Sequence, residues 1–148
     1  MKRHGRDWVI VAALLAVPLF LAACGGTANE GAGADPAAVE QVKGTDLMRV
    51  KLTAEAARLL GVRTEEVRTE GAGGRTVIPY DAVLYDADGG TWTYTSPNHL
   101  VYQRADIRIA RIDGVSAILT RGPPAGTRVV TAGATEIWGV EYGDIEED

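Results

Sequence analysis

Turn-forming residues recur at short intervals through the second half of the chain, and this spacing constrains the fold more than any other feature. Turns at residues 86–90, 96–98, 113–114 and 121–126 separate segments rich in β-branched and aromatic residues. An interval of about 8–12 residues is typical of antiparallel strands joined by hairpins. We therefore predict a mainly β domain, a small antiparallel barrel or sandwich of about 6–8 short strands.

The strands are predicted from alternating apolar and polar residues. They are residues 48–52, 62–69, 76–85, 91–95, 100–112, 115–120, 127–133 and 136–142. Alternation places Trp92 and Tyr94 on one face of their strand. Pro79 confines its segment to an edge, a bend or a strand pair, because proline cannot donate to a central ladder. The alternation slips near Ala110, which predicts a bulge there.

One short helix is predicted at residues 53–60. Thr53 is a suitable N-cap, and Glu55 complements the positive end of the helix dipole. Gly61 suits the left-handed conformation that often follows a helix.

The N-terminal segment has the pattern of an export signal. Lys2, Arg3 and Arg6 precede an apolar run at residues 8–23, and no basic flank follows that run. Its length and small-residue end fit a cleaved signal peptide better than an uncleaved anchor.

The last residues of that segment, Leu21-Ala22-Ala23-Cys24, resemble the lipobox of bacterial lipoproteins. The resemblance implies that residues 1–23 are removed and that Cys24 becomes a lipid-bearing N-terminus. The protein would then be anchored to the cell membrane through this lipid and face the extracytoplasmic, periplasmic side. The alternative is a signal peptide that merely contains a cysteine near its cleavage site.

The chain is predicted to have three further parts. Residues 24–46 are rich in Gly, Ala and short polar residues and lack aromatics, so we expect a flexible tether. Residues 47–143 would form the β domain, and residues 144–148 an acidic tail.

Composition excludes several functions. The chain has 15 Lys and Arg against 20 Asp and Glu, and three of these bases lie in the predicted signal peptide, so we expect no nucleic-acid partner. Its single cysteine, Cys24, permits neither an internal disulfide nor a thiolate zinc site.

His99 follows a turn and is expected to be exposed, and no nucleophile motif accompanies it. Asp86 and Asp88 fit a turn better than a calcium loop. We expect no catalytic residues, no metal and no cofactor other than the lipid.

The pattern VIPYDAVLY at residues 77–85, followed by TWTY, resembles periplasmic adaptor subunits, the membrane fusion proteins of RND-type efflux systems. In that family a Pro-x-x-Ala-Val motif enters the membrane-proximal domain. The positions that carry the resemblance are Pro79, Ala82, Val83, Trp92, Tyr94, Gly122, Gly126, Val129, Val130 and Gly133. Glu136 and Glu141 fall where the closing element of the family has acidic residues.

The resemblance implies a membrane-proximal domain alone, because the lipoyl halves, helical hairpin and separate barrel of full adaptors have no counterpart in this sequence. It implies that the chain contacts an efflux transporter or a full-length adaptor and supports export. A solute-binding or sensing envelope lipoprotein is the alternative. A hydrolase or a remnant of an adaptor gene would also be compatible with the sequence.

Overall fold

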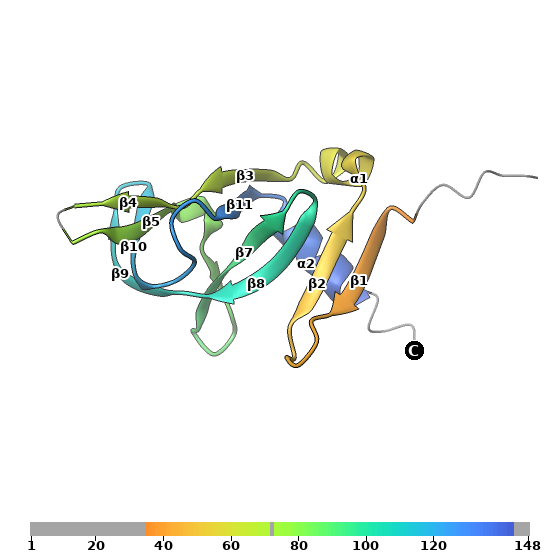
Figure 1. Cartoon of the computed structure of the whole chain (residues 1–148), viewed down its shortest axis with the longest axis horizontal. Coiled ribbons are helices and arrows are strands. Elements are labelled where there is room, and N and C mark those ends of the chain that lie inside the picture. The colour runs from red at the N-terminus through yellow and green to blue at the C-terminus, as the bar shows by residue number, and fades with distance from the viewer. Residues whose placement is uncertain (1–34, 72, 144–148) are drawn as a thin grey trace, which may run out of the picture. The chain divides into compact units, whose positions relative to one another are not determined.

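A computed structural model describes residues 35–71 and 73–143 (Figure 1). The predicted signal peptide at residues 1–23, Cys24 and the predicted acidic tail at 144–148 lie outside the described residues.

The described part contains eleven strands, two α-helices and one short 3₁₀ helix. The strands are β1 (Ala37–Gln41), β2 (Met48–Leu52), β3 (Arg63–Glu66), β4 (Arg68–Glu70), β5 (Arg75–Pro79), β6 (Leu84–Tyr85), β7 (Thr91–Asn98), β8 (Val101–Asp106), β9 (Arg108–Asp113), β10 (Ser116–Arg121) and β11 (Arg128–Ala132). The helices are α1 (Ala54–Leu59), η1 (Tyr80–Ala82) and α2 (Ala134–Gly143). The predicted mainly β class is confirmed.

The strands form two antiparallel sheets. The larger sheet has the order β1-β2-β8-β7-β11-β3, and β6 also pairs with β7. The smaller sheet has the order β4-β5-β10-β9 and lies at the opposite end of the described unit from β1, β2 and α1 (Figure 1). The sheets do not close into a barrel, and the strands outnumber the predicted 6–8 because long segments divide between the sheets.

Two of the four connections between the sheets are single buried residues, Val67 and Ile107. Val67 separates β3 from β4, and its N–H donates to the carbonyl of Thr127. Ile107 separates β8 from β9, and its N–H donates to the carbonyl of Thr91. The segments predicted as single strands at 62–69 and 100–112 are therefore each divided between two sheets, as at the corners of packed sheets.

The predicted bulge at Ala110 is confirmed. Arg111 pairs with Ile118 and Ile109 pairs with Leu119, so Ala110 is the extra residue in β9.

Two apolar clusters fill the molecule. The first lies between the larger sheet and the helices and consists of Val50, Leu52, Ala56, Ala57, Tyr94, Tyr102, Val130, Ala134 and Ile137. The second lies where the sheets meet and consists of Val67, Ile78, Ala82, Val83, Ile107, Ala117, Leu119 and Val129.

The predicted helix at 53–60 is confirmed as α1. The hydroxyl of Thr53 accepts a hydrogen bond from the N–H of Ala56 at 3.1 Å, as the N-cap prediction requires. Gly61 follows with a φ of 65°, which explains the end of the helix.

The predicted final strand at residues 136–142 is wrong, because this segment forms α2. Ala134, Ile137 and Glu141 are buried at the three- and four-residue spacing of a helix face. A strand would also have placed Glu141 on one face with Ile137, but together with Gly139 and without Ala134. Period-2 and period-3.6 patterns are hard to separate over so few residues, and the partners of Glu141 decide the outcome.

The predicted tether is wrong for residues 37–46. β1 pairs with β2 over its full length, from Ala37 opposite Leu52 to Gln41 opposite Met48. Ala37 and Val39 pack against the first apolar cluster. A low-aromatic segment is therefore ordered here, because β2 supplies the hydrogen-bonding partner and the apolar face.

The replacement Val39→Asp tests whether β1 belongs to the fold. We expect the free energy of unfolding to fall by about 1–3 kcal/mol, because the charge replaces an apolar contact with the first cluster. Urea titration followed by circular dichroism measures this change. The matched control is Ala38→Asp on the exposed face of the same strand, and equal effects of the two replacements would contradict the pairing of β1.

Candidate functional site

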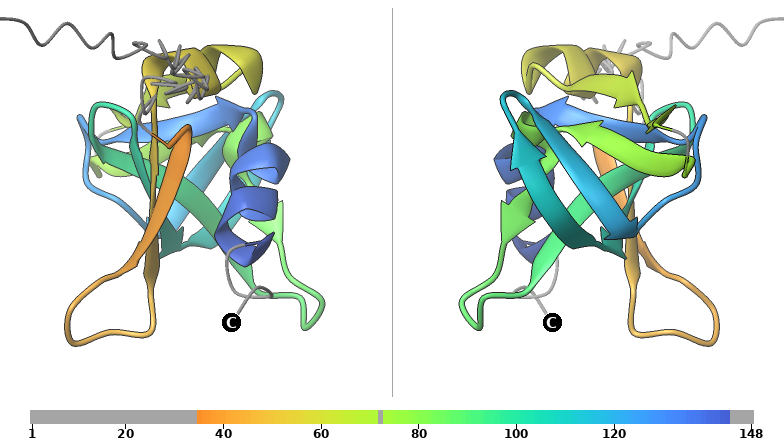
Figure 2. Two further views of the ribbon diagram at one scale, coloured as in Figure 1. Left: turned by 90° about the vertical axis from the view of Figure 1, so that its right-hand side faces the viewer. Right: turned by 90° about the vertical axis from the view of Figure 1, so that its left-hand side faces the viewer.

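Four aromatic side chains are conspicuously exposed on the described unit. Tyr80 is 41% exposed, Tyr85 57%, Trp138 47% and Tyr142 46%. They come from η1, β6 and α2, and Figure 2 shows α2 beside the green segment that carries the β6–β7 hairpin. We call these four side chains the aromatic strip. Aromatic residues are enriched at protein interfaces, so this surface is the first candidate site.

Two short contacts and one shared pocket connect the members of the strip. The hydroxyls of Tyr80 and Tyr85 lie 3.3 Å apart. Tyr85 and Trp138 line one small pocket, with Leu84 and Trp92 among the other lining residues. The rings of Trp138 and Tyr142 meet edge to face with centroids 5.5 Å apart.

Two further aromatic residues, Trp92 and Tyr94, lie on β7 next to the strip. Trp92 and Tyr94 meet edge to face at 5.1 Å, which agrees with their predicted position on one face of a strand. The guanidinium of Arg104 lies 4.4 Å from the ring centroid of Trp92 and 5.0 Å from that of Tyr142. These are cation–π distances, and they connect β8 to α2.

A buried carboxylate fixes α2 under the strip. Oε2 of Glu141 accepts hydrogen bonds from the hydroxyl of Tyr94 and, at 3.0 Å, from Nε of Arg104. Burial, together with the hydrogen bond to Glu141, raises the pKa of the Tyr94 phenol. Burial opposes the charge of Arg104, but the attraction of Glu141 outweighs it and raises the pKa of Arg104 as well. The network is therefore held as a neutral phenol beside a carboxylate–guanidinium pair.

The positions that carry the adaptor resemblance are mostly structural. Ala82, Val83 and Val129 lie in the second apolar cluster, and Tyr94 and Val130 lie in the first. Pro79 ends β5, and half-buried Trp92 is the member that lines the strip pocket.

The three glycines of the resemblance lie where another residue would meet backbone strain or a close contact. Gly126 and Gly133 have φ values of 85° and 80°. Gly133 directly precedes α2, and a Cβ at this position would also lie 2.9 Å from Cα of Val62. A Cβ at Gly122 would lie 2.6 Å from Cδ1 of Leu119 in the second cluster.

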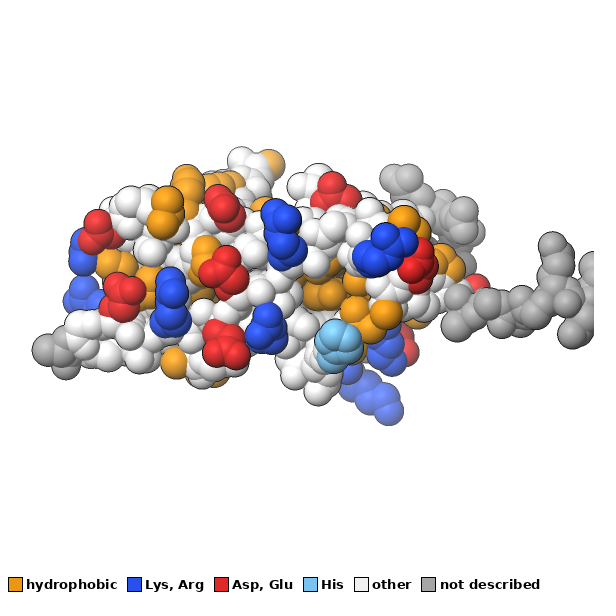
Figure 3. Space-filling view, turned by 90° about the horizontal axis from the view of Figure 1, so that it is seen from above, with side chains coloured by type: hydrophobic (Ala, Val, Ile, Leu, Met, Phe, Trp, Pro, Cys, Tyr) orange, Lys and Arg blue, Asp and Glu red, His pale blue; other side chains and the backbone are white. Residues whose placement is uncertain are grey.

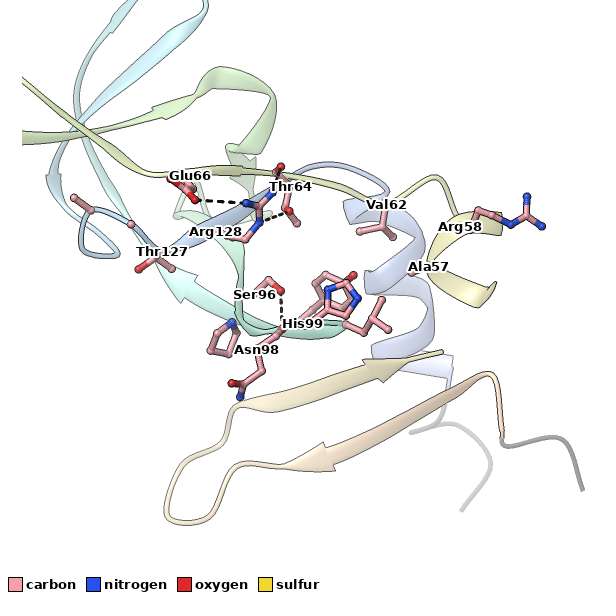
Figure 4. Close-up of a pocket in the computed structure, with 15 residues that line it drawn as sticks. Ala57, Arg58, Val62, Thr64, Glu66, Ser96, Asn98, His99, Thr127 and Arg128 are labelled. Carbon is pink, nitrogen blue, oxygen red and sulfur yellow. Dashed lines mark hydrogen bonds and ion pairs between the residues drawn. The ribbon is translucent and has the colours of Figure 1, made fainter. Parts of the chain in front are cut away.

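A second candidate site is an open groove of about 1040 Å³ near α1, β3 and the turn at residues 96–100 (Figure 4). Its charged groups are already partnered or face outward. Arg128 bonds to Thr64 and lies 3.6 Å from Glu66, and Arg58 points away from the other labelled residues toward Glu55. His99 is exposed, as the sequence predicts.

Asp86 forms the turn that the sequence predicts. Oδ1 of Asp86 accepts from the N–H groups of Asp88 and Gly90, which is a turn. No group of three or more His, Cys, Asp or Glu residues in the described part could hold a metal ion. Basic and acidic side chains alternate on the face shown in Figure 3, so that face has no basic patch of the kind that binds phosphate.

The sequence alone did not reveal the pairing of Glu141 with Arg104, or the contributions of Tyr80 and Tyr85 to a surface. The signal for α2 was the four-residue spacing of Trp138 and Tyr142 and of Ile137 and Glu141. The partners of Glu141 lie 37 and 47 residues away in the chain, and no local pattern indicates them.

Comparison with protein-family models, curated proteins and solved structures finds no match to this chain. Within residues 35–71 and 73–143, no helix has the length and apolar character needed to cross a bilayer.

The replacement Glu141→Ala tests the network. We expect it to lower the free energy of unfolding by about 2–4 kcal/mol, because it leaves Arg104 and the Tyr94 hydroxyl without their partner. The Arg104 side chain retains 23% exposure, which limits the loss. Denaturant unfolding measures it, with Glu136→Ala on the exposed face of α2 as control. A loss no larger than that of the control would contradict the role of Glu141.

The raised pKa of Tyr94 predicts the direction of a pH effect. The phenol ionises near pH 10 in the unfolded chain and higher in the folded protein, so the folded state binds more protons above about pH 10. Stability should therefore be retained below about pH 10 and fall as the pH rises beyond it.

The variant Tyr94→Phe should lack this part of the fall, so the stability difference from the unmodified protein should narrow between about pH 9 and pH 11. Urea unfolding across this range measures it, and parallel curves for the two proteins would refute the effect.

Proposed function

We propose that the protein is a lipid-anchored envelope domain without catalytic activity, whose aromatic strip binds an efflux transporter or a full-length periplasmic adaptor. The continuous exposure of Tyr80, Tyr85, Trp138 and Tyr142 carries this proposal. Exposed aromatic side chains lose little conformational entropy on contact and bury a large area.

The strip is built on supported elements, which favours binding. α2 is fixed by the Glu141 network, and the Trp138 and Tyr142 rings contact one another. A preorganised surface avoids part of the ordering cost that reduces affinity.

Anchoring would strengthen a weak contact. A lipid at Cys24 would confine the domain to the membrane surface and raise its effective concentration near a membrane partner. The order of motifs from Pro79 to Gly133 resembles the membrane-proximal domain of adaptors, which in that family packs against the transporter and neighbouring adaptors.

A second candidate function is that of a solute-binding or sensing lipoprotein. The open groove beside His99 favours it, because its volume of about 1040 Å³ would admit a small solute. A thermal-shift screen separates the two functions, since a solute that binds the folded state raises its melting temperature.

Site-specific photocrosslinking tests the main proposal. Trp138 is replaced by benzoylphenylalanine in the full-length chain, and irradiated membranes are examined by mass spectrometry. We expect crosslinks to a transporter permease or an efflux adaptor, because the probe lies in the strip. Replacement of Cys24 by Ala should reduce the yield by removing the lipid anchor.

The control places the same probe at Leu59, which is 70% exposed on α1 and does not line the strip pocket. Equal crosslinking from Leu59 and Trp138, or crosslinks from Trp138 to unrelated lipoproteins alone, would contradict the proposed function.

A further inference from the structure

The aromatic strip has a consistent charge pattern in the sequence. Each of its four aromatic residues has an acidic residue within two positions, and none has a Lys or Arg within four. These acidic neighbours are Asp81, Asp86, Glu136, Glu141 and Asp144, of which Glu141 is the buried partner of Arg104. Asp81, Asp86 and Glu136 are exposed, so the border of the strip has a negative potential that extends over about a Debye length.

The one cation recorded over an aromatic ring in the described part is already neutralised. Arg104 lies over the rings of Trp92 and Tyr142, but its charge is balanced by Glu141 at 3.0 Å. The outer parts of Tyr85 and Trp138 therefore present electron-rich rings in an acidic surrounding. A cation is the group that both features attract.

The pocket between Tyr85 and Trp138 indicates the size of what enters it. Its volume is about 210 Å³, and Leu84, Trp92 and Ala134 are among the residues that line it. Pockets that enclose a whole small molecule usually measure about 300–1,000 Å³. This pocket therefore fits one apolar side chain of a larger partner.

We infer that the strip binds a segment of a partner protein in which a Lys or Arg lies against the rings of Tyr85 and Trp138 and an adjacent apolar side chain fills their pocket. The inference rests on the proposed function and adds the chemistry of the partner's segment. Cation–π contact and the acidic border select the basic residue, and the pocket selects its apolar neighbour.

Two other occupants are disfavoured by the same charges. The acidic border repels an anionic lipid surface, although tyrosine and tryptophan often lie at membrane interfaces. A second copy that docked strip to strip would bring the acidic borders formed by Asp81, Asp86 and Glu136 of the two copies together, and like charges oppose such a contact.

A displayed library of random peptides, selected on the full-length lipidated protein in nanodiscs, tests the inference. We expect the recovered peptides to share a Lys or Arg next to an apolar residue. Their affinity should fall roughly tenfold in Trp138→Ser and be partly restored in Trp138→Phe, because phenylalanine keeps a ring. It should also fall severalfold when NaCl is raised from about 50 to about 500 mM.

Two variants keep the test independent of folding. Tyr85→Ser lies on another element and should weaken the same peptides, whereas Leu59→Ser on α1 should not. Melting curves of all variants establish that each is folded. Recovery of acidic or uncharged peptides, salt-independent binding, equal binding by Trp138→Ser, or no recovered peptide overturns the inference.

Crosslinking from position 138 separates the remaining outcomes. Adducts with phosphatidylglycerol of the nanodisc, or with a second copy of the chain, overturn the inference in favour of those occupants. Adducts with a transporter, combined with recovered peptides that lack a basic residue, leave the proposed function standing and overturn the inference alone. Recovered basic peptides, with adducts in membranes to neither a transporter nor an adaptor, overturn the proposed function and leave the inferred chemistry of the segment standing.

Discussion

The carboxylate of Glu141 is the constraint on which the C-terminal half of the structure depends. A buried charge is costly unless it is paired and hydrogen-bonded, and Tyr94 and Arg104 supply those partners from β7 and β8. Only a helix places Glu141 over the larger sheet together with Ala134 and Ile137. α2 therefore closes the first apolar cluster, and Trp138 and Tyr142 project at the border of that contact.

A second constraint acts through the backbone. The chain passes between the sheets at Val67 and Ile107, and both side chains pack into the second apolar cluster. This cluster joins the smaller sheet to the larger one. It includes Ala82 of η1 and Val83, which connects η1 to β6. The rings of Tyr80 and Tyr85 are positioned by this connection, so the aromatic strip combines elements that depend on different clusters.

The proposed function is based on the difference between the residues of the two apolar clusters and the exposed aromatic residues of the strip. Most positions that resemble efflux adaptors lie in the clusters or at constrained glycines, so they specify the framework. The surface proposed to bind a partner consists of exposed aromatic residues, which core packing does not require. A fixed aromatic surface with acidic neighbours supports selective contact with one protein, because preorganisation and charge complementarity act together.

The sequence by itself determined the antiparallel β class, helix α1 with its Thr53 cap, the turn at Asp86 and the bulge at Ala110, because these features depend on local periodicity and turn chemistry. Tertiary structure decided what depends on distant partners. β1 is ordered because β2 supplies its hydrogen-bonding partner and an apolar face. The segment of α2 forms a helix because Arg104 and Tyr94 pair with Glu141 across the first cluster. The aromatic strip arose in the same way, since contacts between separated segments bring its four rings onto one surface.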